Sequence, residues 1–188
     1  MTIIIGVVLI VTGRHNTQKL NNIMGYTHYW TYKPDNIENT EELRKRFHAA
    51  VFIINHAYKR IKKNKFIHKG QAGGACDDVP CIIRGGLGEG RPMINESEVW
   101  FNGDGKTDMD HETFGIKWYS GSKSDGFGFC KTNRKPYDLL VCVSLIAFKE
   151  FFDNPEVFTF SSDGGNEDWE TAKDLYTHIT GSFVGDIF

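Results

Sequence analysis

The segment Gly126–Phe152, GFGFCKTNRKPYDLLVCVSLIAFKEFF, is the part of the sequence that decides the fold. Pro136 suits the first position of a helix because its missing N–H would have no intrahelical partner there. Asp138 then falls in the first turn, where the helix dipole favours a negative side chain. The residues from Leu139 onward are almost all apolar, and a helix that is apolar on nearly every side must be buried. We therefore expect a buried central helix that is preceded by a basic loop, with glycines before the loop.

Strand and helix patterns lie on both sides of this segment. Asn39 with Glu42 three residues later marks a helix start, and apolar residues then recur at helical spacing up to Ile61. A last helix is predicted from Asn166 to a stop at Gly181. Strands are predicted at residues 25–32, 81–84, 96–102, 113–119 and 156–161. This order does not alternate regularly, so it favours a single α+β domain with an antiparallel or mixed sheet around the buried helix and two further helices.

Composition limits the class of partner. The chain has 188 residues with a net charge of −2, which indicates no strong attraction to nucleic acid or to a membrane surface. The four cysteines are too few for a disulfide scaffold, and we expect a reduced, cytoplasmic setting. The apolar run Ile3–Val11 is shorter than the roughly 20 residues that cross a bilayer, and it lacks the features of a secretory signal.

The first 23 residues differ in character from the rest, because an apolar run is followed by a polar stretch that leads to Met24. One interpretation is an extension or loose arm at 1–23, with Met24 as the functional start and a domain at 24–188. The other is an ordinary first strand, since short apolar runs are ambiguous.

The basic loop before the central helix is the first candidate site, and its residues are Lys131, Thr132, Arg134 and Lys135. Cations at the positive end of a helix dipole gain nothing from it, whereas an anion held there is stabilised by the dipole and by free backbone N–H groups. We therefore predict a site for a phosphorylated small molecule or nucleotide. The alternative is that internal acids, Asp138, Asp163 or Glu112, pair with these cations.

Three further residues are catalytic candidates: His28, Asp163 and Cys130. A lone histidine among aromatic residues is more often a packed, hydrogen-bonded core residue. Cys130 precedes cations, which would lower a thiol pKa, yet Phe127 and Phe129 indicate the end of a buried strand, where a thiol is inert. Whether the protein is an enzyme stays open, and no cofactor is indicated.

Metal binding is not expected. Asp108, Asp110 and Glu112 have the spacing that opens a calcium loop, but the glycine and the final glutamate that such a loop requires are missing. A divalent-metal site formed by these acids is the weaker alternative, and a solvated hairpin turn is the stronger one. Cys76 and Cys81 form half of a zinc motif without a second pair.

Several strings together resemble a family of bacterial and phage proteins for which no activity is established. They are GYTHYW at 25–30, FNG at 101–103, HETF at 111–114, FCKTNRKPYD at 129–138, SSDG at 161–164 and DW at 168–169. The resemblance extends over about residues 24–179 and favours Met24 as the start. It implies no functional residues.

Two functions follow from these observations. The first is binding, with or without turnover, of a phosphorylated small molecule or nucleotide at the basic loop. The second is a non-catalytic viral or host-modulating interaction protein that uses an aromatic surface, since aromatic residues are enriched at interfaces as well as in cores.

Overall fold

A computed structural model describes residues 25–64, 67–68, 79–119 and 126–188, so the predicted arm at 1–23 lies outside the described part. The helices are α1 (Thr40–Asn64), α2 (Asp138–Phe151) and α3 (Glu170–Thr180), with short 3₁₀ turns at Pro34–Asn36, Gly105–Thr107 and Asn166–Trp169. The strands are β1 (Thr27–Tyr32), β2 (Ile67–His68), β3 (Val79–Pro80), β4 (Met93–Ile94), β5 (Glu98–Phe101), β6 (Phe114–Lys117), β7 (Phe127–Lys131) and β8 (Phe158–Ser162).

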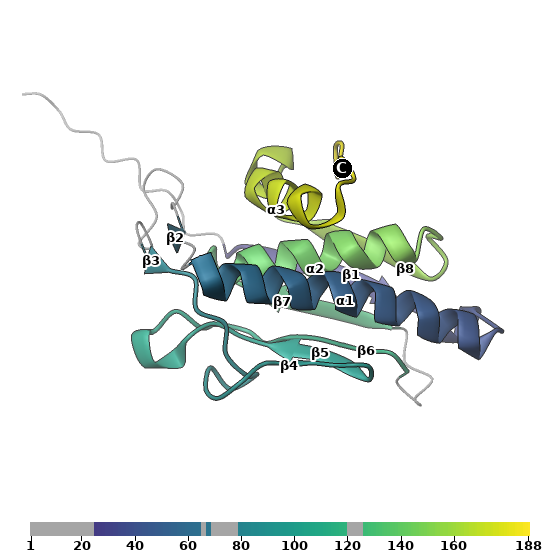
Figure 1. The fold of residues 1–188 in the computed structure, drawn as a ribbon, viewed down its shortest axis with the longest axis horizontal. Coiled ribbons are helices and arrows are strands. Elements are labelled where there is room, and N and C mark those ends of the chain that lie inside the picture. The colour runs from purple at the N-terminus through teal and green to yellow at the C-terminus, as the bar shows by residue number, and fades with distance from the viewer. Residues whose placement is uncertain (1–24, 65–66, 69–78, 120–125) are drawn as a thin grey trace, which may run out of the picture.

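Two three-stranded antiparallel sheets support the helices, in the orders β7-β1-β8 and β4-β5-β6, and the short strands β2 and β3 pair with each other in a further antiparallel sheet. Figure 1 shows α1 and α2 side by side in front of β1 and β7, with β4, β5 and β6 below α1 and α3 above α2. This arrangement confirms the predicted α+β domain. No helix in the described part of the chain is long and apolar enough to cross a membrane.

The helix α2 is the centre of the core, as its sequence predicts. Every residue from Asp138 to Phe148 is buried. The ring of Phe148 in α2 contacts both a sheet and a helix. Its centre lies 5.9 Å from that of Tyr32 and 5.7 Å from that of Phe158, both in the β7-β1-β8 sheet, and 5.6 Å from the ring centre of Phe47 in α1. Contact with neighbours on several sides explains why α2 has no polar face.

The start of α2 differs from the prediction. The helix begins at Asp138 rather than Pro136, because Pro136 lies in a tight turn that precedes it. In this turn the Asp138 N–H donates to the Lys135 carbonyl, and the Leu139 N–H donates to the Pro136 carbonyl. The first backbone N–H groups of α2 therefore already have partners.

The predicted boundaries of the other two helices are nearly correct. Asn39 caps α1, since its Oδ1 accepts the N–H groups of Glu41 and Glu42, each at 3.1 Å. Gly181 ends α3 in the left-handed conformation, with φ 75°. Asn166 was predicted to cap the last helix, but its Oδ1 instead accepts the Ile187 N–H at 2.7 Å and holds the C-terminal segment.

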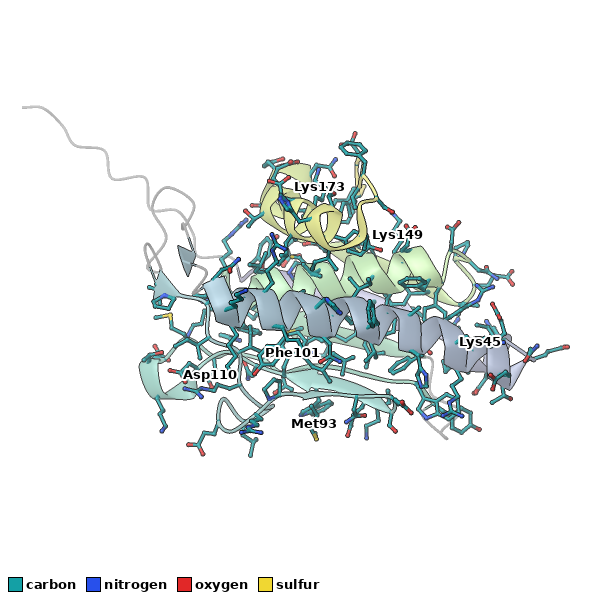
Figure 2. The ribbon with its side chains drawn as sticks, viewed as in Figure 1. Lys45, Met93, Phe101, Asp110, Lys149 and Lys173 are labelled. Carbon is teal, nitrogen blue, oxygen red and sulfur yellow. The ribbon has the colours of Figure 1, made fainter. Side chains whose placement is uncertain are left out.

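The strand predictions are right for β1, β5, β6 and β8 and wrong for residues 81–84. There, a single bridge joins Arg84 to Asn102, because the neighbouring glycines form a turn in which the Gly85 N–H bonds to the Glu89 carbonyl. Figure 2 shows Phe101 of β5 directed into the protein and Met93 of β4 directed away from it. The exposed fraction is 0% for Phe101 and 44% for Met93, so the β4-β5-β6 sheet covers the core with one face only.

Candidate functional site

A buried polar cluster joins β1, the β7–α2 loop and α2. His28 Nε2 lies 2.7 Å from Asp138 Oδ1, and Thr132 Oγ1 donates to the same oxygen at 2.6 Å. His28 is on the inner face of β1, between Cys130 of β7 and Ser162 of β8 in the strand register. The fold therefore brings together two predicted site residues, His28 and Thr132, around the carboxylate of Asp138, which the sequence suggested as a helix-start acid or as a partner of the basic-loop cations.

Cys142 completes this cluster from the next turn of α2. Its Sγ lies 3.6 Å from Asp138 Oδ2 and 3.8 Å from His28 Nε2. Burial alone raises the pKa of Asp138, but the charge and hydrogen bond of His28 and the hydrogen bonds of Thr132 and Cys142 outweigh it and hold that pKa below its usual value. Burial and the Asp138 carboxylate raise the pKa of the Cys142 thiol well above its usual value.

Two aromatic rings enclose His28. The Tyr26 ring lies 5.0 Å from the imidazole and the Trp169 ring 5.2 Å from it, both edge-on. Among the described residues, Tyr26 Oη, His28 Nδ1 and Trp169 Nε1 are buried without a hydrogen-bond partner. Burial raises the pKa of Tyr26 well above its usual value, although the nearby Ser162 hydroxyl partly offsets this effect. Buried polar atoms are rarely left without partners, so these three atoms lower the stability of the folded state.

Arg134 covers the cluster from outside. Its guanidinium lies 4.0 Å from the centre of the Tyr26 ring, and its Nη1 donates to Asp168 Oδ1 at 2.6 Å. Asn133 and Arg134 both have left-handed backbones, with φ 52° and 56°, a conformation that asparagine tolerates but that is unfavourable for arginine. The chain accepts this cost at a position where the N–H groups of Thr132 and Asn133 both bond to the Tyr26 carbonyl.

The other predicted cations point elsewhere. Lys135 Nζ donates to the carbonyl of Asp108, and its side chain is largely buried. Lys131 has its backbone N–H bonded to Glu112 Oε2 at 2.6 Å, while its ammonium lies beside Gly25. The cations of the basic loop therefore do not converge on the start of α2, and Arg134 and Lys135 have internal partners.

Asp163 and Cys130, the remaining catalytic candidates, have structural surroundings. Asp163 directly follows β8; its Oδ2 accepts the Thr27 N–H at 2.9 Å, and its own N–H donates to the Thr27 carbonyl. Cys130 is fully buried, and its Sγ contacts the carbonyl of Glu112 at 3.2 Å. Burial raises the pKa of the Cys130 thiol, in spite of an opposing hydrogen bond from Tyr137, and this disfavours the thiolate that a nucleophilic role requires.

The acids at 108–112 do not form a cluster. Asp108 is 97% exposed in its side chain, Asp110 packs against Gly88, and the Glu112 carboxylate accepts a backbone N–H. Within the described ranges, one group of three His, Cys, Asp or Glu side chains has its ligand atoms within 4.8 Å of one another, and it is His28, Asp138 and Cys142.

A second feature lies on the outer face of the β7-β1-β8 sheet. Phe127 and Phe129 are 56% and 52% exposed, and their rings are 6.1 Å apart. The Tyr29 ring of β1 stacks with Phe127 at 6.5 Å and an interplanar angle of 25°. Lys131 is the next residue of β7 on this face. We call Tyr29, Phe127, Phe129 and Lys131 the aromatic face.

Phe127 and Phe129 were predicted to end a buried strand. They do belong to a strand, but their side chains are exposed, so the predicted burial is wrong. The cause is Gly128, which faces inward between them. A Cβ at Gly128 would lie 2.5 Å from Cε2 of the Trp30 indole, so the indole fills this part of the inner face. The alternation Phe-Gly-Phe was the available signal, because a strand with glycine on its inner face carries its large side chains on the outer one.

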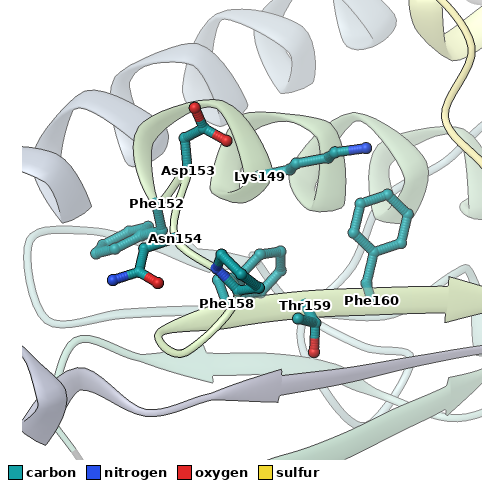
Figure 3. A pocket seen from close by; sticks show the side chains of 8 residues that line it. Lys149, Phe152, Asp153, Asn154, Phe158, Thr159 and Phe160 are labelled. Atoms are coloured by element: carbon teal, nitrogen blue, oxygen red, sulfur yellow. The ribbon is translucent and has the colours of Figure 1, made fainter.

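Two of the hollows among the described residues lie away from these features. One, of ≈ 200 Å³, lies between the end of α2 and β8; Figure 3 shows Lys149 and Phe160 at its edge. The Lys149 ammonium donates a hydrogen bond to the Ile187 carbonyl at 3.0 Å, so it already has a partner within the protein. The other, of ≈ 460 Å³, is lined by exposed cations at the end of α1 and by His178 of α3. None of the predicted site residues lines either hollow.

No protein-family model matches this chain, and neither does any curated protein or solved structure. The residues and their geometry alone must carry the functional argument.

Proposed function

We propose that the protein binds a nucleotide on the aromatic face, with the base stacked on Phe129 and Tyr29 and a phosphate held by Lys131. The observation that carries this proposal is the row of stacked, exposed rings that leads along β7 to a lysine on the same face. Nucleobases stack on aromatic side chains of open sheets regardless of sequence, since every base has a π face. The ligand class is the one that the sequence predicts, moved from the start of α2 to the sheet.

The two faces of the β7-β1-β8 sheet differ in burial. The inner face carries Trp30, Tyr32 and Phe158, which belong to the core around α2. The outer face carries rings that remain exposed, flanked by the hydroxyl groups of Thr159 and Ser161 on β8. Hydroxyls beside a stacking surface supply hydrogen-bond donors and acceptors for a base or a ribose.

Lys131 is the member of the basic loop that fits a phosphate best. Its ammonium has no ion pair among the described residues, whereas Arg134 and Lys135 contact Asp168 and Asp108. A lysine is a compact point charge that binds phosphate without a fixed direction. With a net charge of −2, the molecule adds no long-range attraction, so stacking must supply most of the affinity.

Isothermal titration calorimetry with adenosine, adenosine monophosphate, ribose phosphate and a short single-stranded oligonucleotide tests the proposal. Phe129→Ala should weaken the binding of adenosine monophosphate by about fivefold to 150-fold, the range that one stacked base contributes. Lys131→Ala should weaken the binding of adenosine monophosphate and leave the affinity for adenosine unchanged. The oligonucleotide distinguishes a free nucleotide from a strand as the source of the bases.

Two matched variants on α1 serve as controls. Phe52 is 60% exposed, and Lys59 lies on the exposed side of the same helix, so Phe52→Ala and Lys59→Ala should leave nucleotide affinity unchanged. Equal affinity of wild type and Phe129→Ala would overturn the proposal, provided that both proteins have the same melting temperature.

The second candidate is the non-catalytic interaction protein, for which the aromatic face would contact a protein. The favouring observation is that Trp100 and Met93, on the outer side of the β4-β5-β6 sheet, are also partly exposed, at 37% and 44%. Aromatic residues and methionine are enriched in protein interfaces. This candidate would be favoured if no nucleotide binds and if the wild type self-associates in sedimentation experiments whereas Phe129→Ala does not.

A further inference from the structure

The buried group His28, Asp138 and Cys142 contains three different kinds of metal ligand. Its candidate atoms are an imidazole nitrogen, a carboxylate and a sulfur, separated by 2.7, 3.6 and 3.8 Å. We propose that His28 Nε2, the Asp138 carboxylate and Cys142 Sγ bind one divalent transition-metal ion, for which Zn²⁺ is the best match.

The ligand chemistry selects the metal. Zinc sites are built from cysteine, histidine and carboxylate ligands, whereas calcium and magnesium prefer oxygen alone. A thiolate and a carboxylate together carry two negative charges, so a divalent cation makes the buried group neutral. Neutrality matters here because His28 and Cys142 are 0% and 1% exposed, and an uncompensated charge in such surroundings is costly.

The positions of the ligands are compatible with one ion. Bond lengths of about 2.0–2.3 Å around a tetrahedral zinc place its ligand atoms roughly 3–4 Å apart. The two distances that involve Cys142 fall in this range, and the hydrogen bond from His28 to Asp138 would widen as the ion replaces it. Asp138 and Cys142 are four residues apart on α2, which puts both on one side of the helix.

The surroundings hold the ligands in place. Thr132 Oγ1 donates to Asp138 Oδ1 at 2.6 Å, the kind of contact that orients a ligating carboxylate. The Tyr26 and Trp169 rings enclose the imidazole on both sides. Of the three ligands, Asp138 has the most exposed side chain, at 12%, so an ion would reach the site from its side. Three protein ligands leave a fourth position, as in zinc sites that keep a water.

The test uses the full chain, treated with a chelator and then titrated with Co²⁺ and with Zn²⁺. Cobalt should bind with a thiolate-to-cobalt charge-transfer absorption, and zinc should displace it and raise the melting temperature. Cys142→Ser should lose this absorption. Cys130→Ser, at an equally buried cysteine, and Cys81→Ser, which removes half of the Cys76–Cys81 motif, should retain it.

X-ray absorption spectroscopy of the wild-type zinc complex does not depend on whether a variant folds. It should show one sulfur at about 2.3 Å together with nitrogen or oxygen ligands. A wild-type protein that binds neither Co²⁺ nor Zn²⁺, or a zinc shell without sulfur, would overturn the proposal and leave His28 and Asp138 as a plain buried hydrogen-bonded pair. Retention of the cobalt absorption in Cys142→Ser would also overturn it.

Discussion

His28 Nε2 lies 2.7 Å from Asp138 Oδ1, although 110 positions separate the two residues in the chain. This contact joins the middle strand of one sheet to the first residue of the central helix. The surrounding residues give the carboxylate a second donor, Thr132, and a neighbouring thiol, Cys142. The sheet and the helix are therefore locked together by polar contacts inside an otherwise apolar core.

Asp138→Ala should destabilise the protein by about 3–5 kcal/mol in chelator-containing buffer, because it leaves His28 and Thr132 buried without their partner. Asp138→Asn should cost less, since the amide oxygen still accepts a hydrogen bond. Urea denaturation measures both free energies of unfolding. Asp153→Ala, at an exposed acid just after α2, should remain within about 0.5 kcal/mol of wild type. If Asp138→Ala behaves like Asp153→Ala, the polar cluster does not stabilise the fold.

Phe148→Ala should destabilise the protein by about 3–5 kcal/mol, the usual cost of emptying a packed phenylalanine site. Its ring is fully buried and contacts Phe47, Tyr32, Phe152 and Phe158. Phe52→Ala removes the same group from an exposed position and should change stability by about 0.5 kcal/mol or less. Equal melting temperatures for the two variants would contradict the central place of α2.

Acid should weaken the contact between Asp104 and Arg84. Asp104 Oδ1 accepts the Arg84 Nε–H at 2.6 Å, and Thr107 donates to Oδ2 at 2.9 Å. Burial acts to raise the pKa of Asp104, but these hydrogen bonds and the nearby positive charges outweigh it, so the folded-state pKa is lowered.

The sign of the pH effect follows from this lowered pKa. The stabilisation by Asp104 is fully present above its unfolded pKa of about 3.9 and is lost as the pH falls through the lower folded value. Asp104→Asn should therefore be less stable than wild type near neutral pH, and the two should approach each other in acid. Urea denaturation across this range measures the difference, and a constant gap at every pH would contradict the prediction.

Arg134→Gly should be more stable than Arg134→Ala by about 1 kcal/mol. Both substitutions remove the contacts with Tyr26 and Asp168, but only glycine adopts φ 56° without strain. The order should reverse at Arg46 inside α1, where glycine is the poorer helix former. Thermal or urea denaturation of the four variants measures these differences. Equal stability of the two Arg134 variants would show that the left-handed backbone is not strained.

The helices were predictable from the sequence because helical periodicity and capping are local properties. The spacing of Leu43, Phe47 and Ile54 in α1 indicates one buried side, and the almost entirely apolar sequence of α2 indicates burial on most sides. The start of α2 was misplaced by two residues, because a proline that suits a helix start suits the preceding turn equally well.

The candidate sites were only partly predictable. The sequence pointed to His28 as one candidate and to Thr132 and Arg134 together in the basic loop, and it placed Cys142 only within the apolar run of the central helix. Nothing local indicates that His28 meets Asp138 and Cys142, since that contact depends on how β1 packs against α2. Likewise, Arg134 has an internal partner because α3 follows a turn that carries Asp168.

By itself, the sequence determined the three helices, four of the strands (β1, β5, β6 and β8) and the burial of α2, because hydrophobic burial acts on patterns within one segment. Only the tertiary structure decided which polar groups meet and which aromatic rings stay outside. The indole of Trp30, from a neighbouring strand, occupies the space over Gly128, and this packing leaves Phe127 and Phe129 on the outer face. Contacts between distant segments depend on shape and register, and neither is encoded in a local pattern.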